Sequence, residues 1–452
     1  MEDKLADLSQ SLSDAFAETI ARTQDLPEGY SRLGIDSLMW LTHAARPQTI
    51  SELGDTVAIQ RGQHAIKIKY RPHENLIIEC CQGLATIDAE GHIRVAHHAI
   101  QQYLEDHSET LFPRAKETMA LNCLQYLLFE DFEDGPWQTK DEIDAHMQSY
   151  PFLEYAARYW GEHTREVERD SEVQSMLSRF LACRTAMATA NQVRQYSLGR
   201  RHKYWNAAEC ESFGPLHHAS RHGLQHTMGR LLENGLYHVN ELTKMASTPI
   251  IHAAAGGHIQ TVRKLLEHGA DPYLQNWYGN ALHCAVEAGK SGAIRELVSW
   301  GMNPNEPMGH RPFLGCTLDR DSVDAFETLV ELGADIQTQY VEPGIHIFFS
   351  ACGWDCEKIM RLMMERGWVD IQMRTPAGQS TLHWAAAGSS LETVERLIAA
   401  GVQINALDNG GRSPLDIARY AANEAVIRLL EASGARSGRD IKSEDSRVSI
   451  SP

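Results

Sequence analysis

The sequence predicts a mainly α-helical protein whose second half is a solenoid of about seven stacked two-helix repeats. Three observations predict this fold class. A glycine suited to end a helix recurs at intervals of 34, 32, 32, 34, 34 and 33 residues, at Gly235, Gly269, Gly301, Gly333, Gly367, Gly401 and Gly434. A helix-opening segment precedes each glycine by about twenty residues, and an apolar stripe at helical spacing lies between them. Such a unit cannot bury its apolar face alone, so its copies must stack.

The unit is clearest between Thr248 and Asp271. Pro249 suits the first position of a short helix, because a helix leaves that N–H unbonded in any case. The pair Gly256-Gly257 ends this helix, and Gly269 ends a second one as a C-terminal cap. The second helix carries an apolar face made of Val262, Leu265 and Leu266.

The helix-opening segments share a pattern of apolar and small residues. They read GPLHHAS from Gly214, TPIIHAA from Thr248, NALHCAV from Asn280, PFLGCTL from Pro312, HIFFSAC from His346, STLHWAA from Ser380 and SPLDIAR from Ser413. The pattern resembles the ankyrin repeat, which opens with T-P-L-H-x-A and has a period of about 33 residues. The resemblance implies an ankyrin α-solenoid over residues 206–435. The fourth and fifth copies have lost the motif, so we expect them to pack less regularly.

The first 110 residues predict two smaller parts. Residues 1–30 form an amphipathic helix with an apolar stripe of Leu5, Leu8, Leu12, Phe16 and Ile20. Residues 31–110 indicate three helices followed by a β-hairpin, which is the order of a winged-helix-like domain. The expected helices are Ile35–Leu41, Ile50–Ile59 and Leu76–Leu84, and the expected strands are Ala85–Asp88 and His92–Ala96.

Residues 111–205 predict a helical linker. Its stripes of apolar and aromatic side chains are expected to be core, and they include Met119, Cys123, Tyr126, Phe152, Tyr155, Trp160, Leu177 and Phe180. We expect the linker to cap the open N-terminal end of the array. Residues 436–452 contain few apolar side chains, which predicts a disordered tail.

The N-terminal half also resembles a known family in the order of its segments. SLMWLTHAARPQTISELGDTVAI, IRVAHHAIQQYLED, LNCLQYLLF and PFLEYAARYWGEH are similar to the region that follows the nucleotide-binding module in fungal NACHT–ankyrin proteins. There, a winged helix and a helical linker join a NACHT ATPase to a C-terminal ankyrin array. This chain has no G-x-x-x-x-G-K-[ST] motif, and its one Gly-Lys-Ser, at Gly289, lies in the turn of the third repeat. We therefore expect no ATPase and no nucleotide.

Charge and cysteine content limit the partners. With 42 Lys and Arg against 60 Asp and Glu, the formal net charge is −18. Phosphate backbones and anionic lipid repel such a chain, so neither direct DNA binding nor a membrane surface is expected. The winged-helix region itself has seven basic and ten acidic residues. Nine scattered cysteines, an odd count with no framework spacing, favour a reducing compartment. No apolar run approaches the roughly twenty residues needed to cross a bilayer, so the protein is expected in the cytoplasm, the nucleus or both.

The sequence offers few groups for chemistry. His218, His222 and His226 stand four apart, but Gly223 interrupts the helix, so a structural role is expected rather than a metal. Cys352 and Cys356 have no second pair and predict buried free thiols. We predict no catalytic residue, no metal and no cofactor. The chain is not expected to be an enzyme; the alternative is an enzyme with a pocket between the helical base and the array.

The ankyrin resemblance implies a protein partner held on the concave side of the array, formed by first helices and hairpin tips. Seven residues at these places are the candidate contacts: Trp277, Tyr278, His310, Arg311, Tyr340, Trp384 and His252. The position after the Leu-His pair varies between copies and is expected to project into the groove; it holds His218, His252, Cys284, Cys316, Ser350, Trp384 and Ile417. Trp277 and Tyr278 could instead cover neighbouring loops.

The function expected is that of a scaffold, or of an adaptor and regulator, with transcription coregulation as one form. A further alternative is a fragment of a longer gene with no role of its own.

Overall fold

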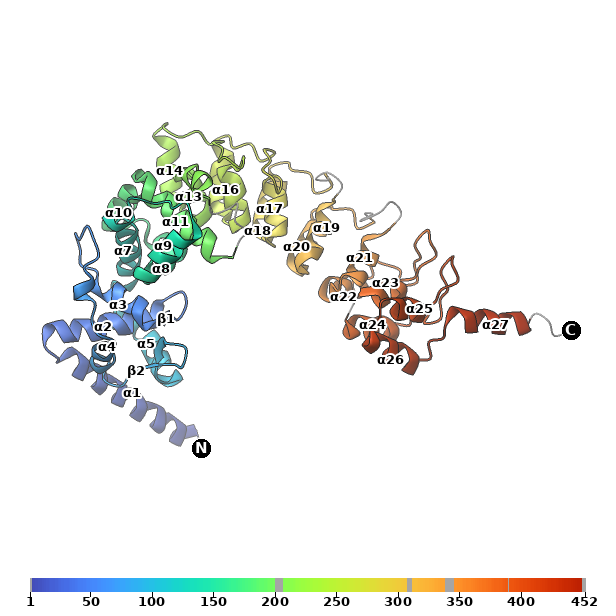
Figure 1. The fold of residues 1–452 in the computed structure, drawn as a ribbon, viewed down its shortest axis with the longest axis horizontal. Coiled ribbons are helices and arrows are strands. Elements are labelled where there is room, and N and C mark those ends of the chain that lie inside the picture. The colour runs from blue at the N-terminus through green and yellow to red at the C-terminus, as the bar shows by residue number, and fades with distance from the viewer. Residues whose placement is uncertain (1, 200–205, 307–310, 338–344, 389, 449–452) are drawn as a thin grey trace. The chain divides into compact units, whose positions relative to one another are not determined.

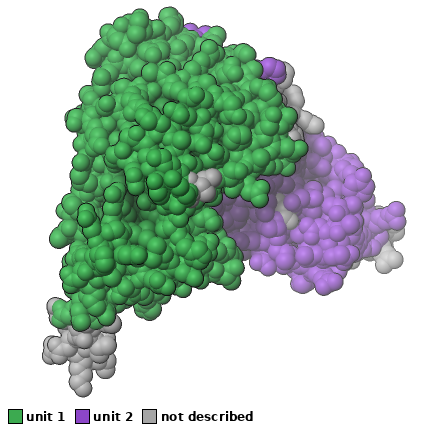
Figure 2. All heavy atoms as spheres, turned by 60° about the vertical axis from the view of Figure 1, so that its left-hand side comes forward, with its two compact units in different colours: residues 1–249 green, residues 250–452 purple. Residues whose placement is uncertain are grey.

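The computed structural model describes residues 2–199, 206–306, 311–337, 345–388 and 390–448 (Figure 1). The chain divides into two compact units, residues 1–249 and residues 250–452 (Figure 2). The first unit contains the winged helix, the linker and the first repeat. The second contains the other repeats and the C-terminal helix.

The N-terminal part is a winged helix preceded by one long helix. Its helices are α1 (Glu2–Gln24), α2 (Glu28–His43), α3 (Ile50–Ala58), α4 (Glu74–Cys80), α5 (His98–Asp106) and α6 (Ser108–Leu111). Its strands β1 (Gln48–Thr49), β2 (Ala85–Ile87) and β3 (His92–Val95) form an antiparallel sheet in the order β1-β3-β2. The predicted helices and hairpin are present. Strand β1 was missed because it has two residues and leads directly into α3, where Thr49 and Glu52 form a capping box.

The linker is helical, as the sequence predicts. It consists of α7 (Ala115–Leu127), α8 (Lys140–Ser149), α9 (Phe152–Val167), α10 (Ser171–Ala182) and α11 (Arg184–Ser197), with 3-10 turn η2 (Glu130–Phe132). The predicted stripes are core, since Tyr126, Phe152, Tyr155 and Trp160 are all buried. Trp40 of α2 meets Phe152 and Tyr155 edge to face, with ring centroids 5.5 and 5.7 Å apart. These aromatic contacts join the winged helix to the linker.

A partly buried histidine at this junction makes the fold sensitive to acid. His163 lies 2.9 Å from the Tyr155 hydroxyl and beside Trp40, and burial lowers its pKa to about 4. In the unfolded chain the group takes up its proton near its ordinary pKa of about 6.5. Neutral His163 therefore contributes fully to the free energy of unfolding above about pH 6.5. This contribution is lost as the pH falls towards 4.

We expect the melting temperature, followed by circular dichroism, to fall across this pH window. Burial lowers the pKa of His218 and His383 in the same direction, so they add to the loss. His163→Gln keeps a polar partner for Tyr155 without titrating and should show a shallower decline. A decline as steep in His163→Gln as in the wild type would contradict the assignment.

The described residues form seven helix pairs, each one repeat. Their helices are α13 (Pro215–His222) and α14 (Gln225–Glu233), α15 (Pro249–Gly256) and α16 (Ile259–Glu267), α17 (Ala281–Glu287) and α18 (Ser291–Ser299), α19 (Phe313–Thr317) and α20 (Val323–Glu331), α21 (Ile347–Gly353) and α22 (Glu357–Glu365), α23 (Thr381–Gly388) and α24 (Leu391–Ala399), and α25 (Pro414–Tyr420) and α26 (Glu424–Ala432). In the second unit, first helices pack on first helices, as in α21, α23 and α25. Second helices pack on second helices, as in α16, α18, α20 and α22.

The fourth repeat is irregular, as expected, because α19 has five residues and continues as a 3-10 turn. The fifth repeat was also expected to be irregular, but it has a regular helix pair.

The recurring glycine links one repeat to the next. Gly301, Gly333, Gly401 and Gly434 all have left-handed φ angles, which glycine adopts without strain. Each carbonyl accepts a hydrogen bond from a side chain of the preceding hairpin: Tyr273 to Gly301 at 3.2 Å, Asn305 to Gly333 at 2.8 Å, Gln372 to Gly401 at 2.8 Å and Asn405 to Gly434 at 3.2 Å. The repeat glycine thus ends a helix and offers a contact between repeats.

The turn between the two helices of a repeat makes a second link. Asp321 and Asp355 occupy the left-handed position that Gly223, Gly257 and Gly289 fill elsewhere, with φ angles of 48° and 60°. The Asp355 carboxylate accepts hydrogen bonds from the Ser390 N–H at 3.1 Å, the Ser390 hydroxyl at 2.6 Å and the Thr393 hydroxyl at 2.9 Å. It therefore caps α24 of the following repeat from outside.

We expect Asp355→Ala to lower the free energy of unfolding by about 1–2 kcal/mol, because it removes this cap and leaves a left-handed alanine. Asp355→Gly loses the cap but relieves the backbone strain, so it should cost less than alanine. Urea unfolding of the full chain measures both. Equal midpoints for the wild type and both variants would show that the cap contributes nothing.

The linker makes the same contact with the first repeat. The Glu168 carboxylate, at the end of α9, accepts hydrogen bonds from the His226 N–H at 2.9 Å and the Thr227 N–H at 3.1 Å, at the start of α14. Helix α9 also packs on α13. The pair α9 and α10 thus occupies the place of a preceding repeat and covers the N-terminal end of the array.

The C-terminal tail differs from the prediction. Residues 436–452 were expected to be disordered, but Gly438–Val448 form helix α27. The Ser437 hydroxyl oxygen accepts a hydrogen bond from the Asp440 N–H at 3.3 Å, and the Gly438 N–H donates to Asp416 of α25 at 2.7 Å. Capping and a contact with the last repeat order this segment, and neither appears in its composition. Residues 449–452 lie outside the described residues.

Candidate protein-binding surface

The hairpin tip between the second and third repeats presents two exposed aromatic side chains. Trp277 is 77% exposed and Tyr278 is 45% exposed. Their backbone is fixed, since the Asn276 side chain accepts hydrogen bonds from the Tyr278 N–H at 2.8 Å and the Gly279 N–H at 3.0 Å. A fixed backbone with exposed Trp and Tyr is typical of a protein contact, because little entropy is lost on binding.

The other candidates have more varied surroundings. Arg311 is partly exposed, and its guanidinium lies 2.9 and 2.8 Å from the two carboxylate oxygens of Asp319. His252 of α15 is partly buried. His310 and Tyr340 lie outside the described residues.

Trp384 was expected to project into the groove, but it is partly buried. Its ring lies 6.0 Å from the Phe349 ring, and its Nε1–H donates to the Gln379 side chain at 3.1 Å. A Cβ added at Gly353 would lie 3.1 Å from the same ring, so the indole rests closely on α21. Part of the indole therefore stabilises the array.

The variable position after the Leu-His pair is mostly buried, so the expectation that it projects into a groove is wrong for four copies. His218, Cys284, Cys316 and Ser350 are all buried. The first helices of neighbouring repeats pack on one another, as α17 does on α19 and α21 on α23.

Two exposed aromatic residues at the ends of first helices were not predicted. Trp354 is 47% exposed and Tyr420 is 93% exposed, and both lie where a first helix of the second unit ends. The equivalent of Trp354 is Gly256, Ala288, Gly388 or Ala421 in four other repeats, and His222 or Arg320 in the remaining two. A tryptophan at a position that is small in most repeats was the available signal.

Tip and helix candidates belong to different repeats. Trp277 precedes α17, whereas Trp384 lies in α23, and the helix pairs α19 with α20 and α21 with α22 come between them in the stack (Figure 1). Only an extended partner could contact both residues.

The histidines and cysteines have structural surroundings. His218 is buried with its ring 5.1 Å from Phe213 and 6.0 Å from Trp160, and burial lowers its pKa. Cys352 and Cys356 are buried free thiols, as predicted, and the Cys356 thiol donates to the Leu318 carbonyl at 3.2 Å.

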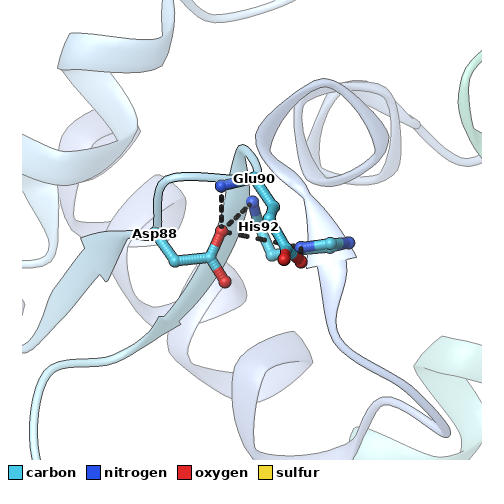
Figure 3. A group of neighbouring side chains, drawn as sticks. All are labelled: Asp88, Glu90 and His92. Atoms are coloured by element: carbon cyan, nitrogen blue, oxygen red, sulfur yellow. Dashed lines mark hydrogen bonds and ion pairs between the residues drawn. The ribbon is translucent and has the colours of Figure 1, made fainter.

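One cluster of possible metal ligands was not predicted. Asp88, Glu90 and His92 meet at the turn between β2 and β3, with His92 Nδ1 3.6 Å from an oxygen of each carboxylate (Figure 3). One Asp88 oxygen already accepts hydrogen bonds from the Glu90 and His92 N–H groups at 3.0 and 2.9 Å, and the other lies 2.8 Å from Arg94 Nε. Both oxygens are engaged, so the arrangement stabilises the hairpin turn.

Family comparisons agree with this architecture. Residues 29–117 match the winged helix domain of the GPI inositol-deacylase family model, and residues 186–276 and 382–431 match ankyrin-repeat models. The chain therefore combines a winged helix of this type with ankyrin repeats, which are a protein–protein interaction module. This combination is consistent with the C-terminal region of NACHT–ankyrin proteins.

Individual relatives share part of their length with the chain. Azaphilone pigments biosynthesis cluster protein L of Monascus ruber is 27% identical over 58% of this chain and 63% of that protein. Transient receptor potential cation channel subfamily A member 1 of Homo sapiens is 27% identical over 51% of this chain and 22% of the channel. The B-cell lymphoma 3 protein homolog of Mus musculus is 23% identical over 48% of this chain and 49% of that protein. The chain spans less than two thirds of the length of these relatives.

Solved structures include two similar ankyrin domains. The human ASB11 ankyrin repeat domain has a TM-score of 0.43 at 22% identity, covering 49% of this chain and 97% of its own. The Bcl-3 ankyrin repeat domain has a TM-score of 0.39 at 22% identity, covering 48% and 97%. Among the described residues, no helix combines the length and apolar character that crossing a bilayer requires.

Proposed function

We propose that this chain is an adaptor that holds a protein partner on its ankyrin repeats and regulates that partner through the contact. The hairpin tip with Trp277 and Tyr278 is the main contact, and Arg311, Trp384 and His252 extend it. His310 and Tyr340 belong to the same proposed set through their place in the repeat. The adaptor acts in the cytoplasm or the nucleus, and transcription coregulation is the finer form of the proposal.

The observation that carries the proposal is the exposure of Trp277 on a tip whose backbone is already fixed. A tryptophan left in water exposes a large apolar surface that folding has not buried, and burial against a partner releases that hydration water. Trp and Tyr are also the residue types that contribute most often to binding energy at protein interfaces. The proposal includes no nucleotide, no direct DNA contact and no membrane.

Photo-crosslinking tests which face of the repeats is used. A photoreactive amino acid is placed at Trp277, and in a matched variant at Trp300, which is 47% exposed and follows second helix α18. Cross-linked partners, identified by mass spectrometry from cells that express the full chain, should arise from position 277 and not from position 300. Equal cross-linking from both positions would contradict a specific tip surface.

A further inference from the structure

The loop between α3 and α4 differs in charge from the rest of the chain. Residues 60–73 contain Arg61, Lys67, Lys69 and Arg71 and no acidic residue, in a protein with a net charge of −18. These four are more than half of the basic residues of the winged-helix region. The net negative charge of that region gives no sign that its basic residues are concentrated in one loop. We call residues 60–73 the basic loop.

The backbone of the basic loop is held in place by the linker. The Gln60 carbonyl accepts a hydrogen bond from the Gln125 side chain at 2.7 Å, and the His64 carbonyl accepts one from the Glu130 N–H at 2.9 Å. The Ile66 N–H donates to the Asp131 carboxylate at 3.0 Å. A loop fixed at several points presents its side chains without first having to order itself.

Two of the four cations already have structural partners. Arg71 pairs with buried Asp55 and donates to the Ser149 carbonyl at 3.0 Å. Arg61 Nε lies 3.8 Å from Glu172. Lys67 and Lys69 are exposed and point to the same ring, with their ammonium groups 5.8 and 5.1 Å from the centre of Tyr70, which is itself 51% exposed.

This arrangement favours an anion. Each lysine is attracted to the face of Tyr70, but the two ammonium groups repel each other. A carboxylate close to the two ammonium groups would offset that repulsion. The tyrosine ring adds an apolar surface for the chain that carries the carboxylate.

We propose that Lys67, Lys69 and Tyr70 form a docking point for an acidic segment of a partner protein, with two or three neighbouring Asp or Glu residues. The surrounding surface selects a short acidic segment over nucleic acid. Helix α4 exposes Glu74 and Glu79, and the wing exposes Glu90, where a winged helix would otherwise meet DNA. A long polyanion would meet these carboxylates, whereas a short segment meets only the basic loop.

The test uses the full chain and a fluorescein-labelled hexaglutamate peptide, with hexaglutamine as the uncharged control. Fluorescence anisotropy should detect hexaglutamate binding at about 50 mM salt and much weaker binding at about 300 mM, because exposed charges are screened. Hexaglutamine should not bind. Lys67→Gln combined with Lys69→Gln should weaken hexaglutamate binding about tenfold without changing the melting temperature, since both side chains are exposed.

The matched control is Lys116→Gln in the same unit, because Lys116 already pairs with Glu166 at 2.7 Å. This variant should bind hexaglutamate like the wild type. Two results would overturn the proposal: unchanged binding in the Lys67 and Lys69 double variant, or a labelled DNA duplex that binds through the same lysines more tightly than hexaglutamate does.

Discussion

Trp277→Ala is expected to leave the free energy of unfolding within about 0.5 kcal/mol of the wild-type value, and to remove about 2 kcal/mol of binding energy for the protein partner. The physical reason is the position of the side chain. The indole is 77% exposed at a hairpin tip, so folding gains little from it. A partner that covers the indole buries apolar surface that stays exposed in the folded chain, and this burial favours binding.

Leu265→Ala is the matched control, with a large expected loss of stability and no expected loss of partner binding. Leu265 lies on the buried face of α16, and its truncation should cost about 2–5 kcal/mol of stability through lost burial and the cavity left behind. Urea unfolding and partner capture on the same preparations measure both quantities. Leu265→Ala should capture the partner normally under conditions where it remains folded.

Two outcomes would change the interpretation. If Trp277→Ala destabilises the protein as much as Leu265→Ala, the indole belongs to the core of the repeats. If Trp277→Ala changes neither stability nor capture, the partner binds elsewhere. Trp384→Ala should fall between the two variants, because its ring also packs on Phe349.

The sequence predicted what is repeated and regular. Seven glycines at intervals of 32 to 34 residues indicate where the second helices end, and their left-handed φ angles explain why the residue recurs. Apolar spacing likewise placed the helices of the winged helix and the linker, since burial of one helix face leaves a period in the sequence.

Structural features that depend on a single contact could not be predicted from the sequence. Helix α27 needs Ser437 as its cap and Asp416 as an external acceptor, and composition alone indicated disorder. Ser350 was placed at the candidate surface because its position varies between repeats, yet it is buried in an array whose first helices pack on one another. Variation between copies shows only that a residue is unconstrained by the repeat motif; exposure also depends on the adjacent copy.

A large loss of stability in the first unit is expected from Asp55→Ala. The Asp55 side chain is fully buried, accepts a hydrogen bond from the Tyr126 hydroxyl at 2.6 Å and pairs with Arg71. Arg71 also donates to the Ser149 carbonyl, so this one carboxylate connects α3, the basic loop, α7 and the end of α8. Burial raises the pKa of Asp55 and works against the charge, while Tyr126 and Arg71 favour it.

Removal of the carboxylate leaves a guanidinium and a hydroxyl without their acceptor in a mostly buried site, which should cost about 3 kcal/mol. Tyr126→Phe removes a single hydroxyl and should cost about 1 kcal/mol, so it reports on the site even if Asp55→Ala does not fold.

Asp55→Leu combined with Arg71→Met removes both charges together. This double variant should be more stable than Asp55→Ala, because no unpaired charge remains and the replacements are apolar. Urea unfolding of the three variants checks the ranking, and an Asp55→Ala variant within about 1 kcal/mol of the wild type would show that the buried carboxylate does not hold the winged helix to its linker.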